Sequence, residues 1–89
     1  MDIKFSVEFK KQHRKIPKKI KEKLVHRLEF FLINPYNPYL NNHALTGNYR
    51  GFRSINITGD WRALYTEERK DGILFITFKF LGTHSQLYR

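Results

Sequence analysis

The sequence predicts an α+β domain in which helices pack on one face of a mostly antiparallel sheet. Three features lead to this prediction: a stretch of alternating polarity near the N-terminus, an amphipathic helical stretch after it, and three strand-like runs separated by turns in the second half. The whole chain, residues 1–89, fits a single domain, because domains span roughly 50–250 residues and no repeat or linker interrupts it.

The N-terminal half is expected to contain one strand and a helical hairpin. Residues 3–9 alternate apolar and polar side chains, which is typical of a strand with one buried face. A long helix is expected after Pro17, because Ile20, Leu24 and Leu28 recur at helical spacing and basic residues occupy the other face. A short helical segment before the proline would complete the hairpin.

The second half is expected to contain strands at residues 49–57, 61–67 and 73–81, which together make a three-strand antiparallel meander. The pair Asp71 and Gly72 supplies the positive φ angles that a tight hairpin turn needs. The last strand has little polar content, which indicates burial on both faces and an interior place in the sheet.

Charge is the strongest signal in the composition. The chain has 17 Lys and Arg against 8 Asp and Glu, a net charge of +9. A surplus of this size attracts polyanions, so nucleic acid is the first partner expected, with an anionic membrane or an acidic protein as alternatives. Many of the basic residues lie within residues 10–23, where a solvated helix face is the plainer explanation.

The sequence has no cysteine, which excludes disulfides and thiolate metal sites and fits a reducing compartment. No stretch approaches the ~18 apolar residues of a membrane span, and the N-terminus lacks the apolar core of a signal peptide. We therefore expect a soluble cytoplasmic protein without a membrane partner.

Groups suited to acid–base chemistry converge at one end of the expected sheet. If residues 61–67 pair with residues 73–81, Arg62 lies near the end of the last strand, and His84 lies within a few ångströms of Asp60. RNA cleavage needs a base for the 2′-OH, an acid for the leaving 5′-oxygen and a cation for the phosphorane. Histidine and arginine meet these needs near neutral pH, so neither a metal nor a cofactor is expected.

Each candidate also has a structural explanation. In the structural explanation, His84 would cap the strand end or bond a carbonyl. Asp60 would stabilise its own turn, a position where aspartate is common. Trp61 either stacks on a base or packs in the core. His43 lies in a loop, where it either stabilises a turn or contacts substrate. These residues by themselves support only a basic α+β domain that binds RNA or DNA.

Four motifs in the second half resemble the RelE/ParE toxin superfamily, and within it the YafQ-like branch of bacterial toxin–antitoxin systems. They follow one another in the family's order and spacing, whereas the N-terminal half matches in layout only. The motifs are HALTG at residues 43–47, GFRS at 51–54, GDWRALY at 59–65 and GTHSQLY at 82–88.

This resemblance implies a RelE-like fold and a toxin that enters the ribosomal A site and cleaves mRNA there, which halts translation. It implies two kinds of partner. One is the ribosome with its mRNA, where the basic helix face would lie on the 16S rRNA surface. The other is a cognate antitoxin protein that covers and blocks the toxin.

The resemblance also assigns roles by position. His84 becomes the general acid or base, with His43 and Asp60 as further acid–base or positioning residues. Arg62 matches an arginine that stabilises the transition state, and Tyr88 an aromatic that orients or stacks on the substrate. The full set of candidates is His84, Asp60, Arg62 and His43 for catalysis, and Trp61, Tyr88, Arg53 and Lys79 for substrate binding, the last two as phosphate contacts or as solvated charges.

Two positions depart from the YafQ-like pattern. Asn56 stands where these toxins often carry a histidine, and Phe80 stands where they carry an arginine four residues before the C-terminal histidine. Arg62 or Lys79 would then have to supply the missing cation.

The alternative function is that of a ParE-like toxin, which inhibits DNA gyrase without nuclease chemistry. Such chains need no histidine in the C-terminal motif, so His84 favours the nuclease. A third interpretation is a basic RNA-binding module that has lost its activity.

Overall fold

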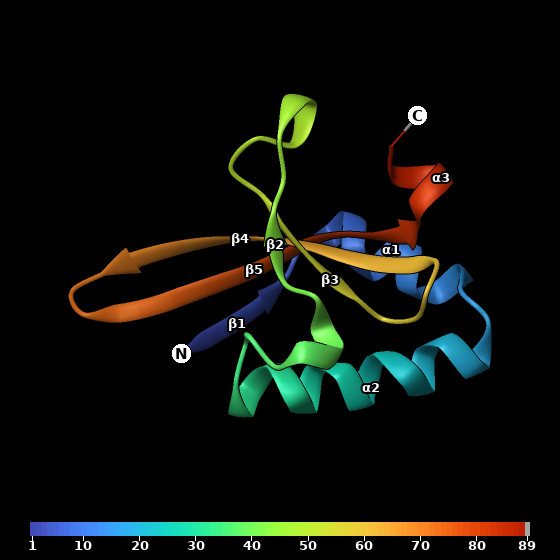
Figure 1. Ribbon diagram of the computed structural model, residues 1–89, viewed down its shortest axis with the longest axis horizontal. Helices are drawn as coiled ribbons and strands as arrows, with labels where there is room; N and C mark the ends of the chain where they lie inside the picture. Colours follow the sequence, from blue (N-terminus) through green and yellow to red (C-terminus); the bar gives the residue numbers. More distant parts are fainter. Residues whose placement is uncertain (89) are drawn as a thin grey trace.

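A computed structural model describes residues 1–88, in which five strands form one sheet and two helices cover one of its faces (Figure 1). This arrangement confirms the expected strand, helical hairpin and antiparallel meander. In chain order the elements are β1 (Asp2–Phe5), α1 (Val7–Lys15), α2 (Lys18–Ile33), the 3-10 helix η1 (Pro38–Leu40), β2 (His43–Ala44), the 3-10 helix η2 (Gly47–Tyr49), β3 (Arg53–Asn56), β4 (Trp61–Lys70), β5 (Ile73–Thr83) and α3 (His84–Leu87).

The strand predicted at residues 3–9 is wrong in its second half, because β1 ends before Ser6 and α1 begins after it. The hydroxyl of Ser6 caps α1 by accepting from the N–H of Phe9 at 3.0 Å, and it donates to the carbonyl of Lys79 at 2.8 Å. Phe9 is buried as expected, but from a helix, whereas Val7 is exposed.

The long helix α2 matches its prediction. It starts after Pro17, and it ends at Asn34, which precedes a proline and takes an extended backbone conformation. Leu24 and Phe31 are buried on the side of α2 that faces the sheet. Among residues 1–88 no helix has the length and apolar composition that crossing a membrane requires.

The strands lie in the order β1-β5-β4-β3-β2. β1 runs parallel to β5, and all other neighbours are antiparallel. β5 lies between β1 and β4, which confirms the interior place that its apolar sequence predicted. β2 was expected to be a loop, but it pairs with β3 and forms one edge of the sheet.

The strand predicted at residues 49–57 is shorter than expected, because β3 covers only Arg53–Asn56. Gly51 has a φ of 94°, a left-handed conformation that ends extended structure on its N-terminal side. Ile55 and Ile57 point into the core and are fully buried.

The hairpin between β4 and β5 is confirmed at its predicted turn. Asp71 and Gly72 have φ angles of 52° and 79°, the pair of positive values that a tight hairpin needs. Both strands are longer than expected and reach Lys70 and Thr83. Their pairing shifts register after Leu64, where a bulge strengthens the local twist.

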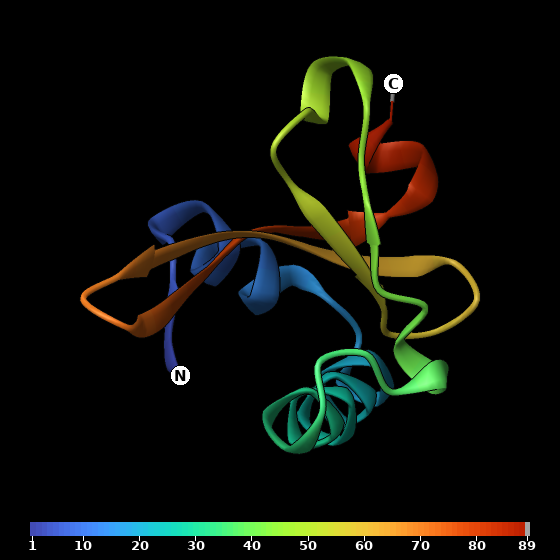
Figure 2. The same ribbon diagram turned by 60° about the vertical axis from the view of Figure 1, so that its left-hand side comes forward.

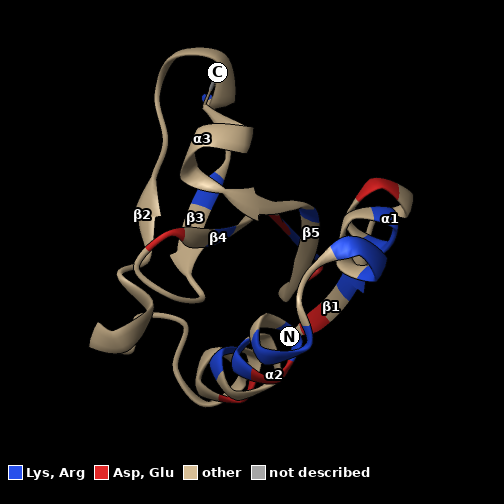
Figure 3. Ribbon diagram, turned by 90° about the vertical axis from the view of Figure 1, so that its right-hand side faces the viewer, with Lys and Arg blue, Asp and Glu red and all other residues tan. Residues whose placement is uncertain are grey.

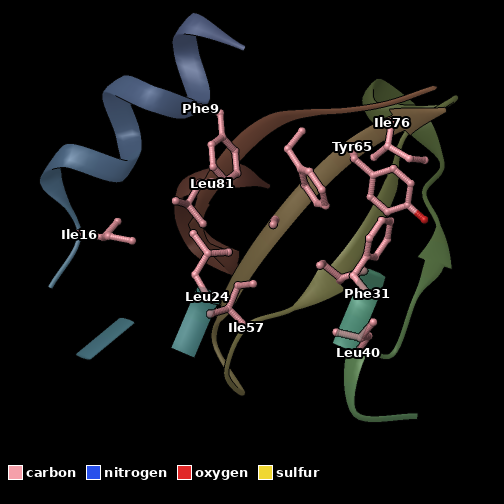
Figure 4. Close-up of a cluster of buried hydrophobic side chains, with 12 residues drawn as sticks. Phe9, Ile16, Leu24, Phe31, Leu40, Ile57, Tyr65, Ile76 and Leu81 are labelled. Carbon is pink, nitrogen blue, oxygen red and sulfur yellow. The ribbon is translucent and has the colours of Figure 1, made fainter. Parts of the chain in front are cut away.

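The main core lies between the two helices and one face of the sheet, which we call the helix face (Figure 4). Phe31 of α2 packs edge-on against Tyr65 and Phe78 at ring-centroid distances of 5.2 and 5.4 Å. The core comprises Phe9, Ile16, Leu24, Phe31, Leu40, Ile55, Ile57, Ala63, Tyr65, Ile76, Phe78 and Leu81.

The opposite side of the sheet, called the second face below, is covered in part by α3 and η2 (Figures 1 and 2). Two rows of paired residues cross β3, β4 and β5 on this face. One row is Ser54, Leu64 and Phe80, and the next is Asn56, Arg62 and Gly82. The second row is the one closer to the end of the sheet where α3 begins.

Candidate active site

The β4–β5 hairpin brings the two C-terminal motifs together at one end of the sheet. Trp61 pairs with Thr83 and Arg62 pairs with Gly82. Beyond this pairing, the backbone N–H of His84 donates to the carbonyl of Asp60 at 3.0 Å. The structure therefore brings His84, Asp60 and Arg62 to one place, as the strand pairing predicted.

The turn that carries Asp60 is held by its own threonine. Thr58 Oγ1 accepts from the backbone N–H groups of Asp60 and Trp61 at 3.3 and 3.1 Å. This arrangement leaves the Asp60 side chain exposed at the tip of the turn. A carboxylate here is accessible to a ligand that approaches the sheet end.

The guanidinium group of Arg62 is anchored to the same turn. Its Nη1 donates to the carbonyl of Thr58 at 3.0 Å and to that of Trp61 at 3.3 Å. The side chain is half-buried on the second face and has no carboxylate partner among residues 1–88. A cation fixed in this way, with donors to spare, suits a developing phosphorane charge.

The short helix α3 is fixed by a capping box. Thr83 Oγ1 accepts from the N–H of Gln86 at 3.2 Å, while Gln86 Oε1 accepts from the N–H of Thr83 at 2.9 Å. Gly82 allows this close packing, since a Cβ there would meet Gln86 Oε1 at 3.0 Å and Leu87 Cγ at 3.4 Å. The hydroxyl of Tyr49 completes the attachment by donating to the carbonyl of Leu87 at 2.7 Å.

The imidazole of His84 lies on the exposed side of α3 against Tyr88. Their ring centroids are 4.6 Å apart, and Tyr88 in turn meets Tyr49 edge-on at 5.5 Å. The backbone N–H of Tyr88 donates to the carbonyl of His84 at 3.0 Å. Tyr88 therefore fixes one side of the imidazole and leaves the remainder open to solvent.

Phe80, which replaces the arginine of the family pattern, belongs to an aromatic cluster under α3. It stacks on Phe52 at 5.8 Å and meets Tyr49 edge-on at 6.0 Å. An arginine at this place would have to leave the cluster or disrupt it. Among the residues described at this end of the sheet, Arg62 is the cation that lies closest along the strand pairing to His84 and Asp60.

His43 lies on the edge strand β2, opposite Ser54, and β3 and β4 separate it from β5. The structure does not bring it into contact with His84. Its Nδ1 lies 2.8 Å from the carbonyl of Asn41, and a carbonyl can only accept. The neutral ring therefore carries its proton on Nδ1 and presents an exposed Nε2 lone pair.

Trp61 and Arg53 lie on the helix face, away from Arg62. Trp61 is half-buried and packs against the core, so both explanations offered for it remain open. Arg53 Nε donates to Asn42 Oδ1 at 2.9 Å, and its guanidinium lies 5.4 Å from the ring centre of Tyr36. Lys79 lies at the β5 bulge. Substrate binding by these three residues stays a prediction.

Comparison with known proteins identifies the family. A family model described as "Bacterial toxin of type II toxin-antitoxin system, YafQ" matches residues 1–89. The chain belongs to this family.

Solved structures place the toxin among its relatives. YafQ from E. coli strain BL21(DE3) is 27% identical over 99% of this chain and 98% of that one, with a TM-score of 0.72. YafQ in the E. coli DinJ–YafQ complex is 28% identical over the same shares, with a TM-score of 0.66. A YoeB/ParE toxin from Agrobacterium tumefaciens shares the fold at 15% identity, covering 94% of this chain and 99% of that one, with a TM-score of 0.75. No curated protein matches.

Basic residues of the toxin gather on α1 and α2 (Figure 3). The one ion pair within residues 1–88 joins His26 to Glu29, so the lysines and arginines of these helices are not neutralised by neighbouring carboxylates. The exposed basic residues are Lys10, Lys11, Arg14, Lys15, Lys18, Lys19 and Lys23.

The structure gives no candidate metal centre within residues 1–88, where no three His, Asp or Glu side chains form a group that could hold an ion. Among the titratable groups of residues 1–88, the one with a clear pKa shift is the phenol of Tyr65, which lies in the core. Burial raises the pKa of Tyr65 above 10.0, and the hydrogen bond that Asn42 Nδ2 donates to its hydroxyl at 2.7 Å lowers it by less.

Sequence reasoning missed the residues that hold the site together. Thr83 and Gln86 form the capping box, and Tyr49 attaches α3 to η2. The spacing Thr-x-x-Gln is a recognised helix-start pattern and would have revealed α3. The hydrogen bond of Tyr49 joins residues 38 positions apart and has no local signal.

Proposed function

We propose that this toxin is a ribosome-dependent endoribonuclease that cleaves mRNA in the A site through attack of the 2′-OH on the adjacent phosphate. The observation that carries the proposal is the juxtaposition at the sheet end: the His84 N–H bonded to the Asp60 carbonyl, beside Arg62 paired with Gly82. The main chain thus brings together three residues that carry an acid–base group, a carboxylate and a guanidinium, and the reaction needs groups of these kinds.

In this proposal His84 exchanges protons with the reacting oxygens, since an imidazole can both accept and donate a proton and this ring is open to a ligand. Asp60 orients the substrate or the imidazolium from the neighbouring turn. Arg62 stabilises the phosphorane charge, and it takes over the part of the arginine that Phe80 replaces. Tyr88 holds the imidazole and offers a ring edge to a base.

His43 would act from the far side of the substrate. Its exposed Nε2 lone pair makes it a base for the 2′-OH, provided that the RNA spans the second face between β2 and α3. The proposal thus gives the two histidines complementary roles, with His43 accepting a proton and His84 donating one to the leaving 5′-oxygen.

The basic helices give the proposal its RNA-binding surface. The exposed lysines and arginines of α1 and α2 would lie on 16S rRNA and hold the toxin in the A site (Figure 3). The toxin would work in the cytoplasm, where ribosomes are found. A cognate antitoxin is the second partner, by analogy with the E. coli relative, which has been solved as a DinJ–YafQ complex.

Primer extension on a reporter mRNA tests the proposal. Expression of the toxin should produce cuts within the translated region, and His84→Ala should abolish them. Unchanged cleavage in His84→Ala would contradict the catalytic assignment. Absence of cuts, together with inhibition of gyrase supercoiling at low toxin concentration, would favour the ParE-like alternative.

A further inference from the structure

A small cavity lies where the C-terminal end of α1 meets the sheet end and α3. Its volume is about 170 Å³, and it lies on the side of the sheet end that faces α1, next to the proposed active site. Its lining residues come from α1, the segment after it, β4, β5 and α3. They are Gln12, Lys15, Ile16, Trp61, Leu81 and Gln86.

Two glutamine side chains in this cavity are fixed in orientation. Gln12 Oε1 accepts from the backbone N–H of Leu81 at 2.7 Å, and Gln86 Oε1 accepts from the N–H of Thr83 at 2.9 Å. A backbone N–H can bond only the oxygen of an amide, so each NH₂ group is turned away from its anchor. Neither NH₂ group donates to a protein acceptor within residues 1–88.

The remaining lining residues complete the chemistry of a ligand site. Trp61 offers the face or edge of an indole, while Ile16 and Leu81 are buried and provide an apolar floor. Lys15 adds an exposed ammonium at the rim and continues the basic surface of α1. The site therefore suits a flat ring with hydrogen-bond acceptors on its edge and a phosphate attached to it.

We propose that this cavity binds a nucleobase next to the scissile phosphate, and that it favours a base with two neighbouring acceptors, as guanine has at O6 and N7. Each glutamine oxygen already accepts a backbone N–H, so the NH₂ groups are the free polar ends of the two side chains. Guanine offers these two donors two neighbouring acceptors, whereas adenine offers one, N7, beside an amino group that is itself a donor. This inference rests on the proposed nuclease function for its biological meaning, but binding in the cavity does not require cleavage.

The position of the cavity fits a strand of RNA that crosses the sheet end. Trp61 and Arg62 are consecutive residues of β4, so their side chains point to opposite faces. One nucleotide would meet Arg62 and His84 on the second face, and its neighbour would meet Trp61 in the cavity. Asp60 directly precedes Trp61 and Arg62 in the sequence, so it lies where the RNA would pass from one face of the sheet to the other.

Fluorescence of Trp61 reports on this site, because the chain has a single tryptophan. Three short single-stranded RNAs serve as probes: one with a guanosine, one with adenosine in its place, and one with an abasic ribose there. We expect saturable quenching that is strongest with guanosine. Equal binding of the abasic RNA, or equal binding of adenosine and guanosine, would overturn the proposal.

The substitutions Gln12→Glu and Gln86→Glu test the donors without removing the anchors. Each keeps an oxygen for the backbone N–H, and glutamate also completes a capping box, but the NH₂ donor becomes an anionic acceptor. Each should weaken the binding of the guanosine RNA about tenfold or more, as expected for loss of a hydrogen bond and an added repulsion. Melting temperatures near that of the wild type would show that the variants fold.

Asn37→Asp is the matched control. Asn37 Oδ1 also accepts a backbone N–H, from Tyr39 at 2.9 Å, and the residue does not line the cavity. It should bind RNA like the wild type. If Gln86→Glu binds the guanosine RNA as tightly as Asn37→Asp does, the proposed base-binding role of the cavity is refuted, even if the toxin cleaves mRNA. Guanosine-specific binding without any cleavage would refute only the proposed nuclease function.

Discussion

The backbone N–H of His84 donates to the backbone carbonyl of Asp60 across 3.0 Å and ties the start of α3 to the turn before β4. Because this bond uses main-chain atoms alone, both side chains remain available to a substrate. Replacing either side chain should therefore leave the local backbone intact. A loss of activity in such a variant would then report the missing side-chain group and not a change in the fold.

Arg62 is expected to be the cation of the site. Arg62→Ala should lower the single-turnover rate of mRNA cleavage on programmed ribosomes by about 10²–10³-fold, the usual effect of removing one group that stabilises a developing negative charge. Arg62→Lys should retain part of the rate, because it keeps the charge without the planar fork. Arg69→Ala, at the exposed far end of β4, is the control. A wild-type rate in Arg62→Ala would exclude Arg62 from the reaction.

Gly82 is expected to tolerate no larger side chain. A Cβ would meet Gln86 Oε1 at 3.0 Å, so Gly82→Ala should displace the capping box and lower the free energy of unfolding by about 1–3 kcal/mol. Gly59→Ala makes a good control, since a Cβ there meets no atom within 4 Å. Urea denaturation compares the two variants. Equal stability of both would show that α3 does not depend on the close approach at Gly82.

Tyr49 is expected to keep α3 in place through its hydroxyl. Tyr49→Phe removes the bond to the Leu87 carbonyl but keeps the ring against Tyr88, and it should cost about 1 kcal/mol. The amide of Tyr88, which donates to His84 in the last turn of α3, should then exchange with solvent faster. Unchanged exchange in hydrogen–deuterium experiments would argue against this role.

Tyr65 is expected to make the fold sensitive to alkali. Burial raises its pKa in the folded state above 10.0, so the unfolded chain loses the phenolic proton first as the pH rises. The stability contributed by the neutral phenol is complete below pH 10 and falls as the pH rises through the folded-state pKa. The loss of unfolding free energy above pH 10 should be smaller in Tyr65→Phe. An identical alkaline profile would contradict the burial effect.

Sequence periodicity was sufficient for the elements that are long and regular. The 3.6-residue spacing of apolar side chains predicted α2. The Asp71-Gly72 turn predicted the β4–β5 hairpin. Both predictions succeeded because helix burial and turn geometry depend on residues that are close in the sequence. Period two failed at residues 6–9, where the alternation of apolar side chains coincided with the start of α1. The N-cap hydrogen bonds of Ser6 decided that competition.

The candidate site could be placed from sequence but not completed from it. Strand pairing brought Arg62 and His84 together, whereas the four-residue helix α3 is too short to show a hydrophobic period. Its stability comes from the capping box and from Tyr49, a contact between distant residues. Phe80 differs from the arginine of the family pattern, and the sequence alone offered no reason for the difference. The stacking of Phe80 on Phe52 supplies one, because it favours an aromatic residue at this position.

A single 2′-deoxy substitution at the cleaved nucleotide of a ribosome-bound mRNA tests the central claim most directly. If the 2′-OH is the nucleophile that the site at His84, Asp60 and Arg62 activates, the deoxy mRNA should bind the toxin normally and resist cleavage. The unmodified mRNA should be cut by the wild type to a 2′,3′-cyclic phosphate and left intact by His84→Gln. Cleavage of the deoxy mRNA at the same position, or full activity of His84→Gln, would contradict the account.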